Sequence, residues 1–336
     1  MTVRVGINGF GRIGRNFLRA TLTRDDLEVV AINDLVPPAT NAHLLKFDST
    51  YGRLAFPVDH SANSISVGDR RIATLSEREP KAIPWADFDV DVAVESTGVF
   101  TDGAKASAHL EAGASRVVIS APASGADATI VIGVNDSDFD PDRHRVVSNA
   151  SCTTNCIVPM VKVLDSAFGL ERGLITTVHA STNDQNLLDL AHRDLRRARA
   201  AGVNIVPTST GAARATSLVM PDMKGRLDGT AMRVPVIDGS ITDLTAVLSR
   251  SVGVEEINEA FRRAASSGPL SKVLAYCDEP IVSSDIIGSP ASCTFDSLLT
   301  MAVGSLVKVF GWYDNEWGYS SRLADLVALV GAGASG

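Results

Sequence analysis

A glycine-rich turn near the N-terminus constrains the fold of this chain more than any other feature. Gly9-x-Gly11-x-x-Gly14 follows a β-branched run at residues 3–7 and opens a helix-like segment at residues 13–22. Glycines at this spacing allow a tight strand-to-helix turn, and they let a pyrophosphate approach the backbone at the helix N-terminus. A merely flexible turn would also fit the three glycines alone. Their place between a strand and a helix favours a dinucleotide-binding fold.

An acidic residue lies at the distance that such a fold requires. A second strand pattern, residues 28–33, ends at Asp34, which is 34 − 14 = 20 residues beyond Gly14. A carboxylate here can accept hydrogen bonds from the ribose hydroxyls, and it would repel a 2′-phosphate of about −2 charge. Leu35 and Val36 follow, so no arginine adjacent to Asp34 could bind that phosphate. Aspartate is also a common turn-former after a strand, but the spacing favours ribose binding and NAD over NADP.

The first half of the chain alternates short β-rich runs with helix-like segments. Further runs cover residues 90–95, 116–120, 129–134 and 145–148, and residues 102–112 are alanine-rich and helix-prone. This alternation predicts an α/β domain built on a Rossmann-type, doubly wound parallel sheet.

After residue 151 the pattern of strand-like and helix-like segments along the chain changes. Strand-like runs at residues 173–179, 230–235, 242–249 and 298–312 are interrupted by helix-like stretches at 211–220 and 255–265. We therefore predict two domains in this chain of 336 residues. The first is an NAD-binding domain over residues 1–150, and the second is an α+β catalytic domain with a mostly antiparallel sheet over residues 151–314.

Composition excludes several functional classes. The formal net charge of -8 argues against a general nucleic-acid surface. No apolar run approaches membrane-spanning length, and the N-terminus enters a strand pattern at once, so we expect neither a membrane segment nor a signal peptide. The four cysteines lack the spacing of a metal site, so we expect no metal and a reduced, cytoplasmic protein.

Cys152 lies where a strand run hands over to a helix-like segment. The octet Asn149-Ala150-Ser151-Cys152-Thr153-Thr154-Asn155-Cys156 separates residues 145–148 from residues 157–164. Unpaired N–H groups and the helix dipole at such a terminus favour a thiolate. A buried structural thiol is the common alternative, but the polar flanks argue against it for Cys152. Cys156, one turn later, fits that packing role.

A helix terminus alone does not suffice to activate the thiol. Lowering a thiol pKa from ~8.5 to ~6 requires about 3.4 kcal/mol, whereas a helix terminus supplies ~0.3–1 and at best ~2 kcal/mol. We therefore expect a nearby imidazolium to contribute. His179 is the candidate, 179 − 152 = 27 residues downstream and one predicted helix and strand away. Oxidation of an aldehyde to an activated acyl group needs a nucleophile, a base and a nicotinamide, and this pair can supply the first two.

The glycine turn, the octet and five further blocks together resemble the signature sequences of phosphorylating glyceraldehyde-3-phosphate dehydrogenases. The blocks occur in family order along nearly the whole chain. They are Glu95-Ser96-Thr97-Gly98-Val99-Phe100, Thr177-Val178-His179-Ala180, Ser209-Thr210-Gly211-Ala212-Ala213, Met232-Arg233-Val234-Pro235 and Trp312-Tyr313-Asp314-Asn315-Glu316-Trp317-Gly318-Tyr319.

The resemblance implies an NAD-dependent oxidoreductase of glycolysis or gluconeogenesis. Its substrates would be D-glyceraldehyde 3-phosphate and inorganic phosphate, and its product 1,3-bisphosphoglycerate, formed through a thioester on Cys152 with His179 as general base. The resemblance also implies a homotetramer, with residues 180–204 at a subunit interface. A C-terminal helix, about residues 315–336, would pack back on the first domain.

The resemblance extends the set of binding residues. To Gly9, Gly11, Gly14 and Asp34 it adds cofactor contacts by Arg12, Ile13, Arg78, Ser120 and Asn315, while Thr97 and Gly98 follow a strand run and can present their backbone to the cofactor. It assigns one anion site to Thr182, Arg197 and Arg233, and another to Ser151, Thr153, Thr210 and Gly211. Thr210 and Gly211 precede a helix-like segment, where hydroxyl and N–H groups converge on phosphate. Arg78 also suits a charged surface loop, and Arg233 a rim salt bridge.

Other functions stay open at this point. Erythrose-4-phosphate dehydrogenase shares the Cys-Thr-Thr-Asn-Cys motif, although the phosphate loop at residues 209–213 favours the triose. A non-phosphorylating aldehyde dehydrogenase would leave two anion sites unexplained. A catalytically silent NAD-binding protein would not explain the joint presence of Cys152, His179, Thr182, Arg233 and Asn315. Ala191 stands where many NAD-specific relatives have proline, which leaves partial NADP use open.

Overall fold

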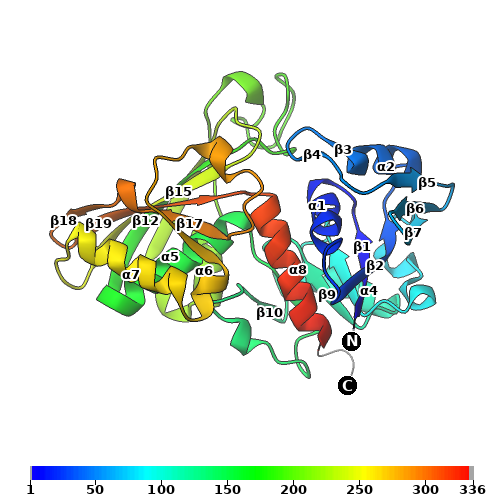
Figure 1. Ribbon diagram of the computed structural model, residues 1–336, viewed down its shortest axis with the longest axis horizontal. Coiled ribbons are helices and arrows are strands. Elements are labelled where there is room, and N and C mark those ends of the chain that lie inside the picture. The colour runs from blue at the N-terminus through cyan, green and yellow to red at the C-terminus, as the bar shows by residue number, and fades with distance from the viewer. Residues whose placement is uncertain (1, 333–336) are drawn as a thin grey trace. The chain divides into compact units, whose positions relative to one another are not determined.

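The computed structural model describes residues 2–332, which form two compact units (Figure 1). The first unit contains the described residues up to Ile130, then Ser137–Ala150, and the described residues from Ser320 onward. The second contains Val131–Asp136 and Ser151–Tyr319.

A nine-stranded sheet forms the centre of the first unit. Its strand order is β10-β11-β9-β8-β1-β2-β7-β6-β5. The strands from β10 to β7 run parallel, and β6 and β5 continue the sheet in antiparallel fashion. The strands are β1 Val3–Asn8, β2 Leu27–Asn33, β5 Val58–His60, β6 Ser64–Val67, β7 Arg70–Leu75, β8 Val92–Glu95, β9 Arg116–Ile119, β10 Ala128–Thr129 and β11 Val146–Ser148.

The order of this sheet reverses beside β1, because the chain passes first to β2 on one side and later to β8 on the other. Ligands of open α/β sheets bind at such a switch point, outside the carboxyl ends of the strands. The helices of this unit are α1 Arg12–Thr21, α2 Pro38–Lys46, α3 Gly103–Ala106 and α4 Ala108–Glu111, and a small hairpin joins β3 Phe47–Asp48 to β4 Gly52–Arg53.

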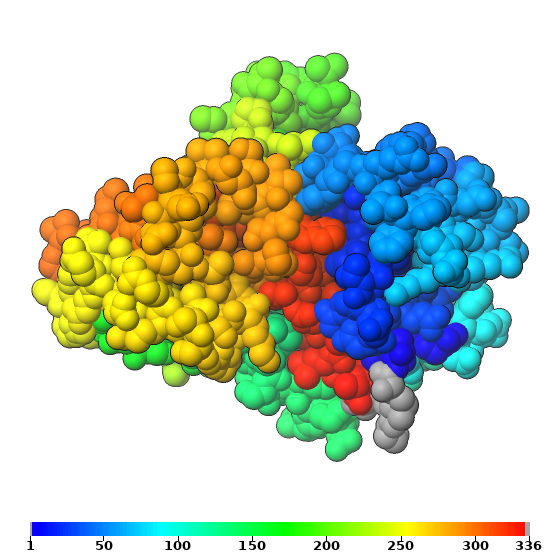
Figure 2. All heavy atoms as spheres, in the orientation of Figure 1, coloured from blue at the N-terminus to red at the C-terminus, as the bar shows by residue number. Residues whose placement is uncertain are grey.

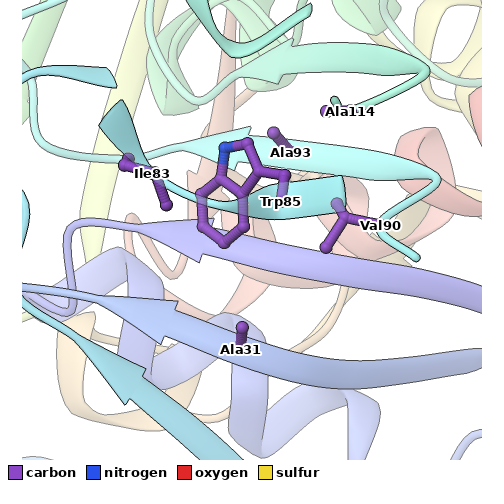
Figure 3. Close-up of a cluster of buried hydrophobic side chains, with 6 residues drawn as sticks. All are labelled: Ala31, Ile83, Trp85, Val90, Ala93 and Ala114. Carbon is purple, nitrogen blue, oxygen red and sulfur yellow. The ribbon is translucent and has the colours of Figure 1, made fainter. Parts of the chain in front are cut away.

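Trp85 is the largest fully buried side chain and anchors an apolar cluster of the first unit. It lies in the 3-10 helix Trp85–Phe88. The indole fits against β1 because Gly6 has no side chain: a Cβ there would lie 2.6 Å from a ring carbon. The other cluster members, which surround the indole in Figure 3, are Ala31, Ile83, Val90, Ala93 and Ala114.

The second unit is an eight-stranded, mostly antiparallel sheet with helices against it. Strand order is β13-β14-β12-β15-β19-β17-β16, and β18 pairs with β19. The strands are β12 Leu170–His179, β13 Val206–Ser209, β14 Leu227–Arg233, β15 Ser240–Leu248, β16 Leu274–Cys277, β17 Cys293–Asp296, β18 Met301–Val303 and β19 Leu306–Tyr313. The long helix α5 Cys152–Phe168 packs on β12, β15, β17 and β19, with α6 Ala212–Val219 and α7 Val254–Ser266 beside it (Figure 1).

Helix α8, Trp317–Ala332, ends the described chain. From Ser320 onward its contacts belong to the first unit. Asp325 pairs with Arg24 at 2.6 Å, and the Val330 carbonyl accepts a hydrogen bond from Arg116 at 3.2 Å. The end of the predicted C-terminal helix, residues 333–336, lies outside the described residues.

The predicted parallel sheet and the second, mostly antiparallel sheet are both confirmed. Two strand predictions are wrong. Residues 129–134 form only the end of β10 and then a turn, because Asn135 Oδ1 accepts from the Val131 N–H at 2.8 Å and closes the chain on itself. The run at 298–312 divides into β18 and β19 around Gly304, whose φ of 64° allows a tight hairpin.

Candidate active site

The glycine turn of the first unit leaves open space at its centre. Gly9 has a φ of 93°, and a Cβ there would lie 2.6 Å from the Thr97 nitrogen. A Cβ on Gly14 would overlap the Gly9 carbonyl oxygen, so this glycine allows α1 to pack against β1. A Cβ on Gly11 would meet no heavy atom within 4 Å. Gly11 therefore borders space into which a phosphate can fit at the start of α1.

Asp34 faces this turn. Its Oδ2 accepts a hydrogen bond from the Phe10 N–H at 2.6 Å, and its Oδ1 accepts from the Val36 N–H at 2.8 Å. A pocket of about 380 Å³ lies at this carboxyl edge of the sheet. It is lined by Asn8, Gly9, Gly11, Asn33, Asp34, Leu35, Glu77, Arg78, Ser96, Thr97, Val99 and Phe100.

The remaining cofactor candidates of this unit lie around the same edge. Arg12 and Ile13 begin α1, and the Arg12 guanidinium pairs with the buried carboxylate of Asp48. Gly98 follows Thr97 with a φ of 73°. Ser120 directly follows β9 and donates its N–H to the Glu95 carbonyl at 2.9 Å. Arg78 lines the pocket from an exposed loop.

Cys152 is the first residue of α5 in the second unit. Ser151 caps the helix: its Oγ accepts from the Thr154 N–H at 3.0 Å. The serine hydroxyl thus satisfies one of the unpaired N–H groups that every helix N-terminus leaves. The predicted strand-to-helix transition at Cys152 is confirmed.

His179 ends β12 and faces this thiol. Its Nε2 lies 3.4 Å from Cys152 Sγ. Its Nδ1 lies 2.8 Å from the Ala180 carbonyl oxygen. The same Nδ1 also contacts Arg233 Nη1. A carbonyl oxygen can only accept and a guanidinium can only donate, so these two contacts require opposite tautomers. Nε2 is an acceptor toward the thiol in the tautomer that carries its proton on Nδ1.

Arg233 supplies the positive charge of this site. It ends β14, in register with His179 on the parallel neighbour β12, and its guanidinium lies against the imidazole. Burial raises the pKa of the Cys152 thiol, and the charge of Arg233 opposes this rise. Burial and Arg233 lower the pKa of His179 to about 3. The sequence led us to expect a protonated His179 beside the thiol. Instead, Arg233 is the permanently charged group there, and His179 is a neutral imidazole at pH 7.

Tyr313 joins the elements around the thiol, and the sequence reasoning did not single it out. Its buried hydroxyl lies 2.9 Å from Thr153 Oγ1 and 2.8 Å from Thr177 Oγ1, and its ring meets the His179 ring edge-on at 5.9 Å. Thr153, predicted to bind phosphate, thus directs its hydroxyl to Tyr313. A tyrosine ending a strand run just before Asn315 was the available signal.

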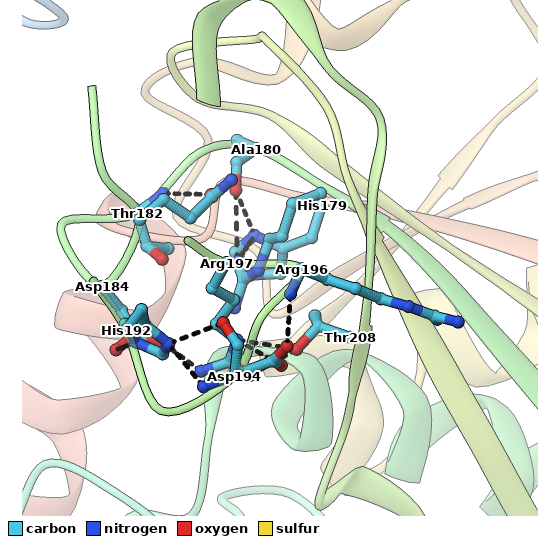
Figure 4. A network of polar contacts seen from close by, with 11 residues as sticks. His179, Ala180, Thr182, Asp184, His192, Asp194, Arg196, Arg197 and Thr208 are labelled. Atoms are coloured by element: carbon cyan, nitrogen blue, oxygen red, sulfur yellow. Dashed lines mark hydrogen bonds and ion pairs between the residues drawn. The ribbon is translucent and has the colours of Figure 1, made fainter. Parts of the chain in front are cut away.

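Arg197 is held in a polar network of the same unit (Figure 4). Its Nε donates to Thr208 Oγ1 at 2.7 Å, and its guanidinium pairs with Asp184 and lies 3.5 Å from Asp194. His192 Nε2 lies 3.5 Å from the same Asp184. Two carboxylates therefore hold the cation that the family resemblance assigned to a substrate phosphate.

Three other predicted anion-site residues, and Asn315 of the predicted cofactor contacts, lie at element ends of the second unit. Thr182 follows β12, and its N–H donates to Gln185 Oε1 at 3.1 Å. Thr210 Oγ1 accepts from the Ala212 N–H at 3.2 Å, and Gly211 precedes α6 with open space at its Cβ position. Asn315 is buried, and its Oδ1 accepts from Ser240 Oγ at 2.7 Å.

Residues 2–332 contain neither a cluster of metal-binding side chains nor a membrane-spanning helix. No group of three or more His, Cys, Asp or Glu side chains there is placed to hold a metal ion. In the same range, every helix is too short or too polar to cross a membrane.

Comparison with known proteins finds matches over both units. The family model described as glyceraldehyde 3-phosphate dehydrogenase, NAD binding domain, matches residues 3–103, and the model of the C-terminal domain matches residues 151–315. Proteins named glyceraldehyde-3-phosphate dehydrogenase from Streptomyces coelicolor and Mycobacterium avium are 59% and 60% identical to this chain. Glyceraldehyde-3-phosphate dehydrogenase 2 of Streptomyces avermitilis is 58% identical. Each alignment covers 98% of this chain and 99% of the relative.

Proposed function

Because the chain belongs to the glyceraldehyde-3-phosphate dehydrogenase family, we propose that it oxidises D-glyceraldehyde 3-phosphate with NAD and inorganic phosphate to 1,3-bisphosphoglycerate. It is an NAD-dependent oxidoreductase. The observation that carries the proposed chemistry is the 3.4 Å approach of Cys152 Sγ, at the start of α5, to His179 Nε2.

Cys152 is the nucleophile and His179 the general base. As Sγ attacks the aldehyde carbon, the thiol proton passes to His179 Nε2 and from there to the carbonyl oxygen, which becomes the hydroxyl of a hemithioacetal and leaves His179 neutral again. Arg233 favours the thiolate that forms during this transfer. His179 then takes the hydroxyl proton as the carbon loses a hydride, which leaves a thioester on Cys152.

Residues of the first unit fit the cofactor. The open space at Gly11 and the backbone N–H groups at the start of α1 suit a pyrophosphate, and Asp34 suits the ribose hydroxyls. Arg78 and Thr97 line the same pocket. When bound, NAD supplies the acceptor of the hydride.

Two anion sites complete the reaction. We assign the phosphate of the substrate to Thr182, Arg197 and Arg233, so that it competes with Asp184 for Arg197. We assign the attacking inorganic phosphate to Ser151, Thr210 and Gly211, where a helix N-terminus supplies N–H groups. Phosphate attacks the thioester carbon, the C–S bond breaks, and the acyl phosphate leaves the Cys152 thiolate behind.

We further propose a cytoplasmic homotetramer. All four cysteines lie within the described residues and are free, as suits a reducing compartment. Residues 182–204, the green lobe in Figure 2, expose four leucines to solvent in this single chain. Apolar side chains gathered on one surface segment are typical of a subunit interface, and these are Leu187, Leu188, Leu190 and Leu195.

Initial rates test the proposed function directly. Rates are measured with glyceraldehyde 3-phosphate, with and without inorganic phosphate, and with NAD and then NADP. The proposal expects turnover that depends on phosphate and strongly prefers NAD. Turnover that is indifferent to phosphate, or faster with erythrose 4-phosphate, contradicts the triose assignment, and comparable rates with NADP contradict the selectivity assigned to Asp34.

A further inference from the structure

Three neighbouring strands of the first unit all end in a polar residue at the cofactor pocket. Asn8 ends β1, Asn33 ends β2 and Glu95 ends β8. In the parallel register Asn8 pairs with Asn33 on one side and with Glu95 on the other. All three are buried, with exposed fractions of 3%, 2% and 2%. Their side chains therefore meet in a row beneath the switch point of the sheet.

Side-chain hydrogen bonds connect Asn33, Asn8 and Glu95, and each of them is donated toward Glu95. Asn33 Nδ2 donates to Asn8 Oδ1 at 2.8 Å, and Asn8 Nδ2 donates to Glu95 Oε2 at 2.6 Å. The Glu77 N–H donates to Asn33 Oδ1 at 2.7 Å, and the Glu77 carbonyl accepts from Asn33 Nδ2 at 2.8 Å. A backbone N–H and a carbonyl cannot exchange roles, so Glu77 fixes the orientation of both amide side chains.

The opposite end of the row is fixed by His109. Trp85 Nε1 donates to His109 Nδ1 at 3.0 Å, and an indole N–H can only donate. The imidazole proton is therefore on Nε2, which donates to Glu95 Oε2 at 3.0 Å. The Thr97 N–H and hydroxyl donate to Glu95 Oε1 at 2.9 and 2.5 Å. Every neighbour that bonds Glu95 in these contacts is a donor, so the network requires an acceptor-only side chain at this position.

The residues of this network lead directly into the loops that line the cofactor pocket. Asn8 precedes Gly9, Asn33 precedes Asp34, and Glu77 precedes Arg78. Thr97 is itself in the pocket wall, together with Asn8 and Asn33. A shift of any strand end would move the backbone that faces the cofactor.

We propose that Glu95 is a positioning residue for NAD, acting through Asn8, Asn33, His109 and Thr97 to hold four pocket loops in register. The inference rests on the proposed use of this pocket for NAD. It assigns no contact with the reacting atoms to Glu95. Loss of the acceptor at this position is expected to weaken NAD binding while leaving the chemistry at Cys152 intact.

The pH dependence of NAD binding to the Asn8→Asp variant tests the direction of the hydrogen bonds in this network. The substitution places a second carboxylate against Glu95, and two buried carboxylates in contact bind one shared proton. Protonated Asp donates to Glu95 as the native Nδ2 does. We expect the dissociation constant for NAD to exceed the wild-type value about 10-fold or more at pH 8.5, with the difference falling to about 3-fold at pH 5.5.

Two further variants and one control accompany it. Asn33→Asp places a carboxylate at the other end of the row. Its dissociation constant for NAD should likewise approach the wild-type value at low pH. Glu95→Gln introduces a donor that faces donors, and should weaken NAD binding at every pH while kcat at saturating NAD stays within about 2-fold. Asn63→Asp is the matched control, because Asn63 lies in an exposed turn and uses only its Oδ1.

The readouts are calorimetric NAD binding, thermal unfolding of the NAD-free protein, and kcat and KM from initial rates. If the variants lose thermal stability but bind NAD like the wild type at a temperature where all are folded, Glu95 is only structural and the inference is overturned. A dissociation constant for Asn8→Asp and Asn33→Asp that exceeds the wild-type value equally at all pH values also overturns it. A wild type that binds no NAD would instead overturn the proposed function.

Discussion

His179 Nε2 lies 3.4 Å from Cys152 Sγ, while the opposite nitrogen of the same ring faces the Ala180 carbonyl. In the tautomer that carries its proton on Nδ1, this orientation points an unprotonated nitrogen at the thiol. The pair combines the end of a strand with the start of a helix, and both positions are set by backbone geometry.

His179→Asn removes the base and keeps a polar side chain of similar size. We expect kcat to fall about 100- to 10,000-fold, the usual contribution of general acid–base catalysis. The dissociation constant for NAD should not change, because His179 is not among the residues that line the NAD pocket. Stopped-flow hydride transfer and calorimetry measure the two effects, and a loss below 10-fold would remove His179 from the base role.

Arg233→Gln tests the electrostatics of the thiol. Arg233 opposes the rise in the pKa of Cys152 that burial causes, and it lowers the pKa of His179. Without this cation, the pKa of both groups should rise, so ionisation of the thiol should need a higher pH. The measurement is the pH dependence of Cys152 alkylation by iodoacetamide. A profile that stays in place or moves to lower pH would contradict the assignment.

Asp34→Asn tests cofactor selectivity. The neutral amide would no longer repel the 2′-phosphate of NADP and would bind the ribose hydroxyls less strongly. We expect the ratio of kcat/KM for NAD over NADP to fall about 10-fold or more, since charged hydrogen bonds contribute about 1.5–3 kcal/mol. Glu111→Gln, the same loss of charge at an exposed site, is the control and should leave the ratio unchanged.

Gly11→Ala and Gly14→Ala separate binding from folding. A Cβ at position 11 meets open space, whereas one at position 14 overlaps the Gly9 carbonyl oxygen. Gly11→Ala should weaken NAD binding without lowering the thermal midpoint of the NAD-free protein. Gly14→Ala should lower both. Equal thermal midpoints for the two variants would show that the packing of α1 on β1 does not need Gly14.

Much of this site follows from local sequence patterns. The glycine turn, the spacing to Asp34 and the strand-to-helix transition at Cys152 depend on residues close together in the chain, so periodicity and composition reveal them. Residues 129–134 misled the same reasoning: their apolar run is buried in a turn closed by Asn135 instead of in a strand.

The rest depends on neighbours distant in the sequence. Tyr313 meets Thr153 and Thr177 only after β19, α5 and β12 have come together. Glu95 gains its donors from Asn8 and His109, 87 and 14 residues away. Arg233 rather than His179 carries the positive charge beside the thiol because His179 is buried, and no local sequence pattern indicates that burial.

The most direct test of the account is to trap the thioester. Enzyme is mixed with NAD and glyceraldehyde 3-phosphate in the absence of inorganic phosphate, and the burst of NADH and the intact mass of each subunit are measured. The account predicts one NADH per active site and an acyl adduct on the peptide that contains Cys152, which added phosphate removes. A burst without an adduct on Cys152, or an adduct that phosphate does not discharge, would contradict it.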